Sequence, residues 1–121
     1  MMVRGLRGAT TVENDEEQAV LEATQALVEE MVKENSVLPG DIISVLISTT
    51  TDIKSTFPAK AVRSIDGWMY VPVMCTHEMD VSGAMPLCIR ALMHVNTDIP
   101  QRYVKHIYQK NAVKLRPDLQ K

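Results

Sequence analysis

Hydrophobic and polar positions change period along the first third of the chain. Residues 3–11 alternate as in a strand, and this places Arg7 on the same side as Val3. From residue 15 to about residue 35, apolar side chains recur every three or four positions, and Asn14 is suited to cap the first turn. The pattern predicts a β-strand followed by one long amphipathic helix.

The middle of the chain is predicted to hold shorter elements. Branched apolar residues at 42–48 predict a buried strand, and residues 59–65, after a proline, predict a short helix. Residues 69–76 are typical of a strand that includes Pro72. Because proline has no backbone N–H to donate, this strand is expected at the edge of a sheet.

The last third of the chain adds a clean alternation and several short elements. Residues 87–96 place apolar side chains on one face, whereas Arg90 falls on the other face. A short helix is predicted at 98–104 and a final strand near 106–108. The whole pattern predicts an α+β fold, in which a mixed sheet carries one long and several short helices mainly on one face. The uncovered face of such a sheet favours oligomerisation.

Composition and charge narrow the class of protein. The chain has 121 residues, 45% hydrophobic and 23% charged, and no internal linker, so residues 1–121 are expected to form a single folded domain. The formal net charge of -2 lacks the broad positive field of a nucleic-acid-binding protein. No apolar run approaches the roughly 20 residues that span a bilayer. We therefore expect a cytoplasmic protein without nucleic-acid or membrane partners.

Candidate residues for metal or cofactor chemistry are sparse. Cys75, Cys88 and the histidines lack the spacing of zinc ligands, and no glycine-rich phosphate-binding loop is present. Cys75 has the pattern of an inert buried thiol rather than a nucleophile. No metal and no cofactor are expected.

Two arginines stand out because they lie in predicted strands. A half-buried guanidinium at Arg90 is costly unless an anion or a carboxylate meets it. An internal ion pair with Glu78 and a bound anionic ligand fit the pattern equally well. Arg7 lies between Gly5 and Gly8, which allow close approach of a ligand, although a solvated strand arginine fits too. The pattern leaves these alternatives open.

Six segments of the chain, in order and without large insertions, resemble the small monofunctional chorismate mutases. They are residues 4–13 (RGLRGATTVE), 57–63 (FPAKAVR), 71–73 (VPV), 78–81 (EMDV), 88–90 (CIR) and 113–119 (VKLRPDL). The resemblance spans nearly the whole chain. It implies a homotrimer that forms a pseudo-α/β barrel, with active sites in clefts between adjacent subunits.

The resemblance also implies the reaction, which is the rearrangement of chorismate to prephenate in phenylalanine and tyrosine biosynthesis. Arg90, Glu78 and Arg7 would be the catalytic residues. Arg7, Arg90 and Tyr108 would hold the enolpyruvyl carboxylate, Arg90 would also reach the ether oxygen, and Glu78 and Cys75 would lie by the ring hydroxyl. The resemblance implies further substrate-binding residues at Phe57, Ala59, Lys60, Arg63, Val73, Met74, Leu115 and Arg116. Met74 departs from relatives that carry a small polar residue there.

Arginines suit this reaction because it is concerted and needs no nucleophile, acid or base. An enzyme can select the compact conformer of the substrate and place fixed charge near the ether oxygen. The alternatives are a non-catalytic trimer that binds an anionic metabolite, a related trimeric enzyme that acts on imines, and a protein-interaction module. The last would use the helical stripe of Val20, Leu27 and Met31, which core packing explains more simply.

Overall fold

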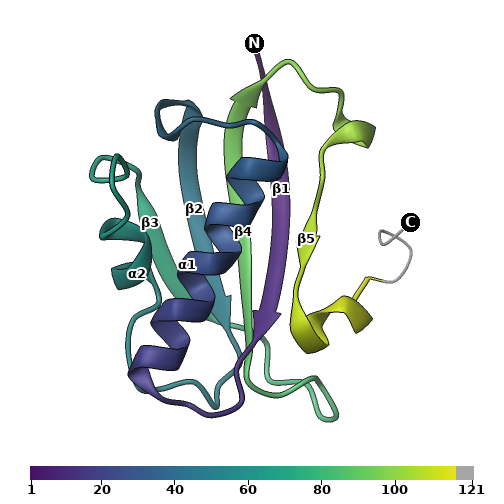
Figure 1. The fold of residues 1–121 in the computed structure, drawn as a ribbon. Coiled ribbons are helices and arrows are strands. Elements are labelled where there is room, and N and C mark those ends of the chain that lie inside the picture. Colours follow the sequence, from purple (N-terminus) through teal and green to yellow (C-terminus); the bar gives the residue numbers. More distant parts are fainter. Residues whose placement is uncertain (117–121) are drawn as a thin grey trace.

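The computed structural model describes residues 1–116, which form a mixed sheet with helices packed on one face (Figure 1). The sheet has five strands in the order β3-β2-β4-β1-β5. β4 pairs antiparallel with β1 and β2, whereas β3 and β5 add parallel pairs at the two edges. The strands are β1 (Met2–Thr11), β2 (Ile42–Thr49), β3 (Val73–His77), β4 (Cys88–Thr97) and β5 (Ile107–Tyr108). The predicted α+β class with a mixed sheet is confirmed.

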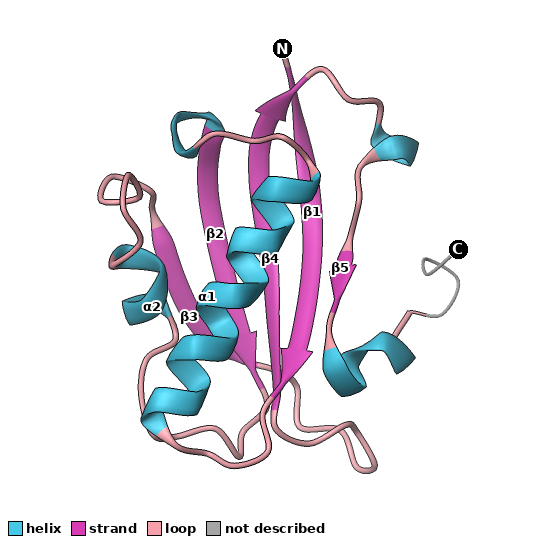
Figure 2. Cartoon of the chain, viewed as in Figure 1, coloured by secondary structure: helices cyan, strands magenta, loops and turns pink. Residues whose placement is uncertain are grey.

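The two α-helices lie on the same face of the sheet (Figure 2). α1 (Glu17–Glu34) crosses the middle of the sheet diagonally, and α2 (Ala59–Arg63) lies beside β3. Three short 3₁₀ turns complete the described chain: η1 (Pro39–Asp41), η2 (Gln101–Tyr103) and η3 (Lys110–Lys114). No helix within residues 1–116 is long and apolar enough to cross a membrane. Residues 117–121, which include the end of the 113–119 segment, lie outside the described residues.

The core lies between α1 and the sheet. Side chains of α1 at helical spacing are fully buried, as are the alternate side chains of β4 that face them. The fully buried residues of these two elements include Val20, Leu27, Val28, Met31, Ile89, Met93 and Val95. The apolar stripe of α1 is therefore occupied by the protein's own sheet, and the alternative of an interaction module built on this stripe is wrong.

The start of α1 differs from the prediction. The helix begins at Glu17, and its N-cap is Glu16 without a side-chain hydrogen bond, so Asn14 is not the cap. The carboxylate of Asp15 instead accepts hydrogen bonds from the backbone N–H groups of Lys54, at 2.9 Å, and Ser55, at 3.1 Å. This tertiary contact holds residue 15 outside the helix, which sequence periodicity could not indicate.

β2 also differs from the buried strand that its composition predicted. Ile42 pairs with Val95 and Ser44 with His94, so Ile43 is an additional residue, a β-bulge. Beyond the bulge, the strand alternates between a buried side and a half-buried or exposed side. β2 is therefore covered on one face only in this chain.

Three other short elements occur where they were predicted, but with different bounds. The strand predicted at 69–76 starts only at Val73, so Pro72 precedes it and is not part of it. β3 is an edge strand that starts directly after Pro72, whose carbonyl accepts a hydrogen bond from Val45 N at 2.9 Å. The helix predicted at 59–65 is α2, and the helix predicted at 98–104 is only the single turn η2.

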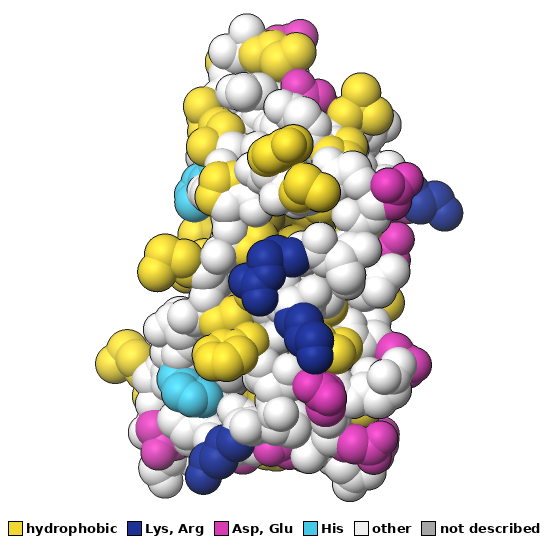
Figure 3. Space-filling model, turned by 90° about the vertical axis from the view of Figure 1, so that its left-hand side faces the viewer, with side chains coloured by type: hydrophobic (Ala, Val, Ile, Leu, Met, Phe, Trp, Pro, Cys, Tyr) yellow, Lys and Arg dark blue, Asp and Glu magenta, His cyan; other side chains and the backbone are white. Residues whose placement is uncertain are grey.

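The face of the sheet opposite α1 is open within the described part of the chain. Apolar side chains on it are exposed, among them Val3, Leu46 and Leu92. At the β3 edge Met74 is 71% exposed, and Phe57 nearby is 74% exposed. Viewed from this edge, two basic side chains lie near the middle of the surface, with hydrophobic side chains above and to the left of them (Figure 3). The open face carries the candidate site.

Candidate active site

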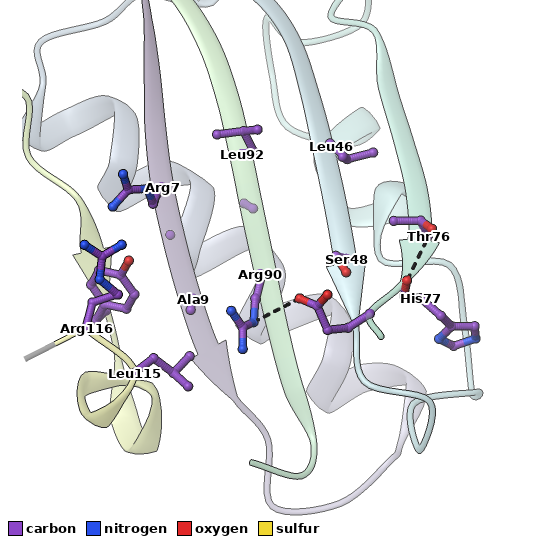
Figure 4. Close-up of a pocket in the computed structure, with 14 residues that line it drawn as sticks. Arg7, Ala9, Leu46, Ser48, Thr76, His77, Arg90, Leu92, Leu115 and Arg116 are labelled. Carbon is purple, nitrogen blue, oxygen red and sulfur yellow. Dashed lines mark hydrogen bonds and ion pairs between the residues drawn. The ribbon is translucent and has the colours of Figure 1, made fainter. Parts of the chain in front are cut away.

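A hollow of about 510 Å³ lies on the open face of the sheet. It runs over β1, β4 and β2, and residues at the C-terminal end of the described chain form one wall (Figure 4). Six residues that the resemblance implied for substrate binding line it: Arg7, Glu78, Arg90, Tyr108, Leu115 and Arg116.

Strand pairing brings Arg7 and Arg90 into this hollow together. Arg7 pairs with Leu92, and Arg90 pairs with Ala9, so the two arginines are diagonal neighbours on one face of the β1–β4 pair. Diagonal neighbours have Cα atoms about 7–8 Å apart, within reach of one small molecule for side chains of this length. The strand register therefore places Arg7 and Arg90 close together, although they lie far apart in the sequence.

The hollow exists because the residues beside Arg90 are small. Its partners across the sheet are Ala9 on β1 and Ser48 on β2, and neither fills the space above the strands. Leu46 and Leu92 line the same hollow. In Figure 4 they lie above Arg90. The site thus combines charged groups with apolar walls, as binding pockets for small molecules commonly do.

Arg90 forms an ion pair with Glu78. Nε of Arg90 lies 3.3 Å from Oε2 of Glu78, and the dashed line from Arg90 in Figure 4 marks the contact. This ion pair is not a hydrogen bond: the buried Nε has no hydrogen-bond partner among the described residues. Arg90 is therefore balanced in charge but keeps an unused donor.

Two backbone hydrogen bonds fix the position of Glu78, one to its main chain and one to its carboxylate. Its backbone N–H donates to the carbonyl of Thr49 at 2.7 Å, which extends the β2–β3 pairing by one residue. Its Oε1 accepts a hydrogen bond from the backbone N–H of Met79 at 3.1 Å. The side chains of Arg90 and Glu78 remain 44% and 34% exposed. Both can therefore contact a ligand in the hollow, so the two alternatives for Arg90 do not exclude each other.

Cys88 lies near Arg90 but is not activated by it. Burial raises the pKa of the Cys88 thiol, although the positive charge of Arg90 acts in the opposite direction. The thiol is therefore protonated at neutral pH, and a thiolate nucleophile is not provided here. Within residues 1–116, no three His, Cys, Asp or Glu side chains gather in a way that could hold a metal ion.

Other residues that the resemblance implied lie outside this hollow in the single chain. Phe57, Lys60 and Cys75 line a second hollow of about 490 Å³ between α2 and β3. There Sγ of Cys75 accepts a hydrogen bond from the backbone N–H of Ala59 at 3.2 Å, and Nζ of Lys60 lies 3.4 Å from Glu17 Oε2.

The remaining four implied residues line neither hollow. Ala59, the first residue of α2, is buried. Arg63 is the last residue of α2 and is exposed. Val73 is partly buried on β3, whereas Met74, which pairs with Leu46, is exposed. Thr76 and His77 line both hollows, so the two hollows are neighbours along the β3 edge. A single chain thus divides the implied site into two adjacent groups.

Sequence reasoning missed several residues of the first hollow, including Ser48, Thr76 and Leu46. The alternation within each strand shows which side chains share a face. It does not give the register between strands, and the register decides which of these side chains reach the arginines.

Comparisons with known proteins agree with this geometry. The sequence profile of the family described as chorismate mutase type I matches residues 3–119. Chorismate mutase AroH of Bacillus subtilis (strain 168) is 51% identical over 119 residues, covering 98% of this chain and 94% of that protein. Chorismate mutase AroH of Thermus thermophilus is 43% identical over 120 residues, with 98% of each chain covered. The solved chorismate mutase from Clostridium thermocellum superposes with a TM-score of 0.87 at 41% identity, covering 89% of this chain and 96% of that one. The chain belongs to the chorismate mutase type I family.

Proposed function

We propose that this chorismate mutase binds chorismate in the hollow of the open sheet face and uses Arg7, Arg90 and Glu78 as its catalytic residues. As a chorismate mutase it is an isomerase of aromatic amino-acid biosynthesis. The observation that carries the site assignment is the convergence of Arg7 and Arg90 on one hollow, where Nε of Arg90 has no hydrogen-bond partner in the described part of the chain. Arginine suits a dicarboxylate because its planar fork binds a carboxylate through two parallel hydrogen bonds.

The reaction needs a fixed environment rather than reactive side chains. The bond between the ring and the ether oxygen breaks while a carbon–carbon bond forms between the enolpyruvyl methylene and the ring. The electrons move within the substrate, no proton is transferred, and no cofactor takes part. The protein can contribute by holding the compact conformer and by placing positive charge where the ether oxygen gains electron density.

Each residue of the hollow has a role in this proposal. Arg7, Tyr108 and Arg90 hold the enolpyruvyl carboxylate, and Arg90 also donates to the ether oxygen. Glu78 accepts a hydrogen bond from the ring hydroxyl. Leu115 and Arg116 close the C-terminal wall. Mixing the purified protein with chorismate and following the loss of the conjugated-diene absorbance tests the activity. An unchanged spectrum would contradict it.

Glu78 is predicted to act as a hydrogen-bond acceptor and not as a base. Because the rearrangement transfers no proton, kcat measured in D₂O should equal kcat in H₂O once the chemical step limits turnover. Glu78→Gln keeps the acceptor oxygen and should retain more activity than Glu78→Ala. A clear solvent isotope effect on the chemical step, or equal losses in both variants, would contradict the assignment.

We further propose that the enzyme is a homotrimer whose complete site combines the two hollows across a subunit boundary. The open sheet face and the exposed apolar side chains beside the site support an assembly that covers them. In this arrangement Phe57, Ala59, Lys60, Arg63, Val73, Met74 and Cys75 of one subunit wall the pocket that holds Arg7 and Arg90 of the next. Sedimentation of the purified protein measures the number of subunits.

Subunit mixing tests the shared site directly. Arg90→Ala removes the central cation, and Phe57→Asp places a negative charge where the proposed wall meets the dianion, so each variant alone should be nearly inactive. Unfolding and refolding a 1:1 mixture should restore about one quarter of the wild-type activity. In a cyclic trimer, this is the fraction of boundaries with both native residues. No recovery in mixtures that reassemble would place the two residues in the same subunit's site.

Residues 1–121 act as one chorismate mutase domain in this proposal, in line with the profile match to residues 3–119. We also propose a cytoplasmic location. The two cysteines, Cys75 and Cys88, are free thiols, as is usual in a reducing compartment.

A further inference from the structure

The strand that carries Tyr108 is attached to the sheet by few backbone contacts. β5 pairs with β1 only through Gly8–Ile107 and Ala9–Tyr108, and Gln109 N adds a hydrogen bond to Ala9 O at 2.9 Å. The same segment leads through η3 to Leu115 and Arg116 in the wall of the hollow. The position of this wall relative to Arg7 therefore depends on whatever else ties β5 to β1.

His106 provides such a tie directly before β5. Its Nδ1 atom accepts a hydrogen bond from the backbone N–H of Arg7 at 3.0 Å. The side chain thereby adds a contact one position before the β1–β5 pairs, which start at Gly8 and Ile107. Because the side chain of Arg7 faces the hollow, one hydrogen bond links the backbone of a substrate-binding arginine to the strand of Tyr108.

We propose that His106 is a positioning residue for the chorismate mutase reaction, whose imidazole Nδ1 fixes the spacing between Arg7 and Tyr108. The inference rests on the proposed placement of chorismate in the hollow. It assigns His106 no contact with the substrate. Its effect reaches the substrate through Arg7 and Tyr108.

The segment is anchored independently on the helix side, so loss of the His106 contact should not release it. Asn35 is buried at the end of α1, and its side-chain amide pairs with the backbone of Lys105. Oδ1 accepts from Lys105 N at 2.8 Å, and Nδ2 donates to Lys105 O at 2.9 Å. The segment before β5 is therefore already attached to α1, and the Arg7–His106 contact sets only its position relative to β1.

The tie requires an imidazole that is unprotonated at Nδ1. Burial lowers the pKa of His106, and the positive charges of Arg7 on β1 and Arg116 beyond η3 lower it further. At neutral pH Nδ1 is therefore an acceptor. As the pH falls through the lowered pKa of His106, Nδ1 gains a proton and can no longer accept the N–H of Arg7.

Three variants separate this role from simple packing. His106→Asn places an acceptor oxygen where Nδ1 lies, His106→Gln places it one bond further, and His106→Leu removes it. We expect the Asn variant to stay within about twofold of wild-type kcat/KM, whereas the Gln and Leu variants lose about five- to tenfold, mainly through a higher KM. As the pH falls through the lowered pKa of His106, the wild type should lose kcat/KM, and the Asn variant should show a flatter profile.

Several results would overturn the proposal: wild-type kcat/KM in both the Gln and Leu variants, an Asn variant as impaired as Leu, or an unchanged acid profile in the Asn variant. If the Leu variant fails to fold, as judged by thermal unfolding, the comparison of Asn with Gln decides alone. Arg90→Ala separates this inference from the site assignment. An active Arg90→Ala variant would refute the hollow, whereas an inactive one together with normal Gln and Leu variants would refute only the role of His106.

Discussion

Arg90→Ala is expected to lower kcat at least about a hundredfold while the fold is retained. Removing one preorganised donor from a developing oxyanion typically costs roughly 3–4 kcal/mol, which corresponds to about a hundredfold to a thousandfold in rate. Arg90 points away from the core, which lies on the opposite face of β4. Its ion pair with Glu78 is partly exposed, and such pairs contribute only about 0–1 kcal/mol to stability. The initial rate of chorismate loss and the thermal unfolding temperature measure the two effects.

Two further variants separate the role of Arg90 from a general loss of positive charge. Arg102 is exposed, and its guanidinium carbon lies 5.0 Å from the ring centre of Tyr103, away from the hollow, so Arg102→Ala should keep the wild-type rate. Arg90→Lys keeps the charge but loses the planar fork, and it should recover only part of the rate. A folded Arg90→Ala enzyme with a nearly normal kcat would refute the proposed contact with the ether oxygen.

Periodicity predicted the elements of the fold better than their arrangement. The stripe of α1 and the two faces of β4 follow directly from the spacing of apolar residues, because one packed face dominates each element. The strand order and the pairing of β1 with both β4 and β5 depend on contacts between distant segments. Where prediction failed, tertiary contacts decided the outcome: Asp15 binds a distant loop, and the bulge at Ile43 shifts the alternation of β2.

The candidate site was predictable only in part for the same reason. A charged residue in an apolar strand marks Arg90 as unusual, but it does not reveal whether the partner belongs to the protein or to a ligand. The structure gives Arg90 a partner in Glu78, and its Nε still has no hydrogen-bond partner within residues 1–116. Ser48 and Thr76 are not unusual in the sequence of their strands, and only the register of β2 and β3 brings them to the hollow. The resemblance named the charged residues, and the geometry supplied their small neighbours.

Gly8→Val is expected to destabilise the protein by about 1–3 kcal/mol, which should lower its melting temperature by several degrees. Gly8 lies on β1 beneath α1. A Cβ atom there would clash with Sδ of Met31 and would lie 3.1 Å from Cδ1 of Leu27. Both side chains are fully buried, so the end of Met31 cannot move aside without displacing other core atoms. Because Gly8 also lines the hollow beside Arg7, displacement of β1 away from the helix should lower kcat as well.

A double-mutant cycle attributes this loss to the contact with α1. Met31→Ala opens space opposite Gly8, so the penalty of Gly8→Val should be much smaller in that background, although Met31→Ala itself costs roughly 2–5 kcal/mol. Gly40 provides the external control, since a Cβ atom there would meet no atom of residues 1–116 within 4 Å, and Gly40→Val should be nearly neutral. Thermal unfolding of the single and double variants measures the coupling. Equal penalties of Gly8→Val with Met31 present and absent would show that the helix and β1 are not in tight contact at this glycine.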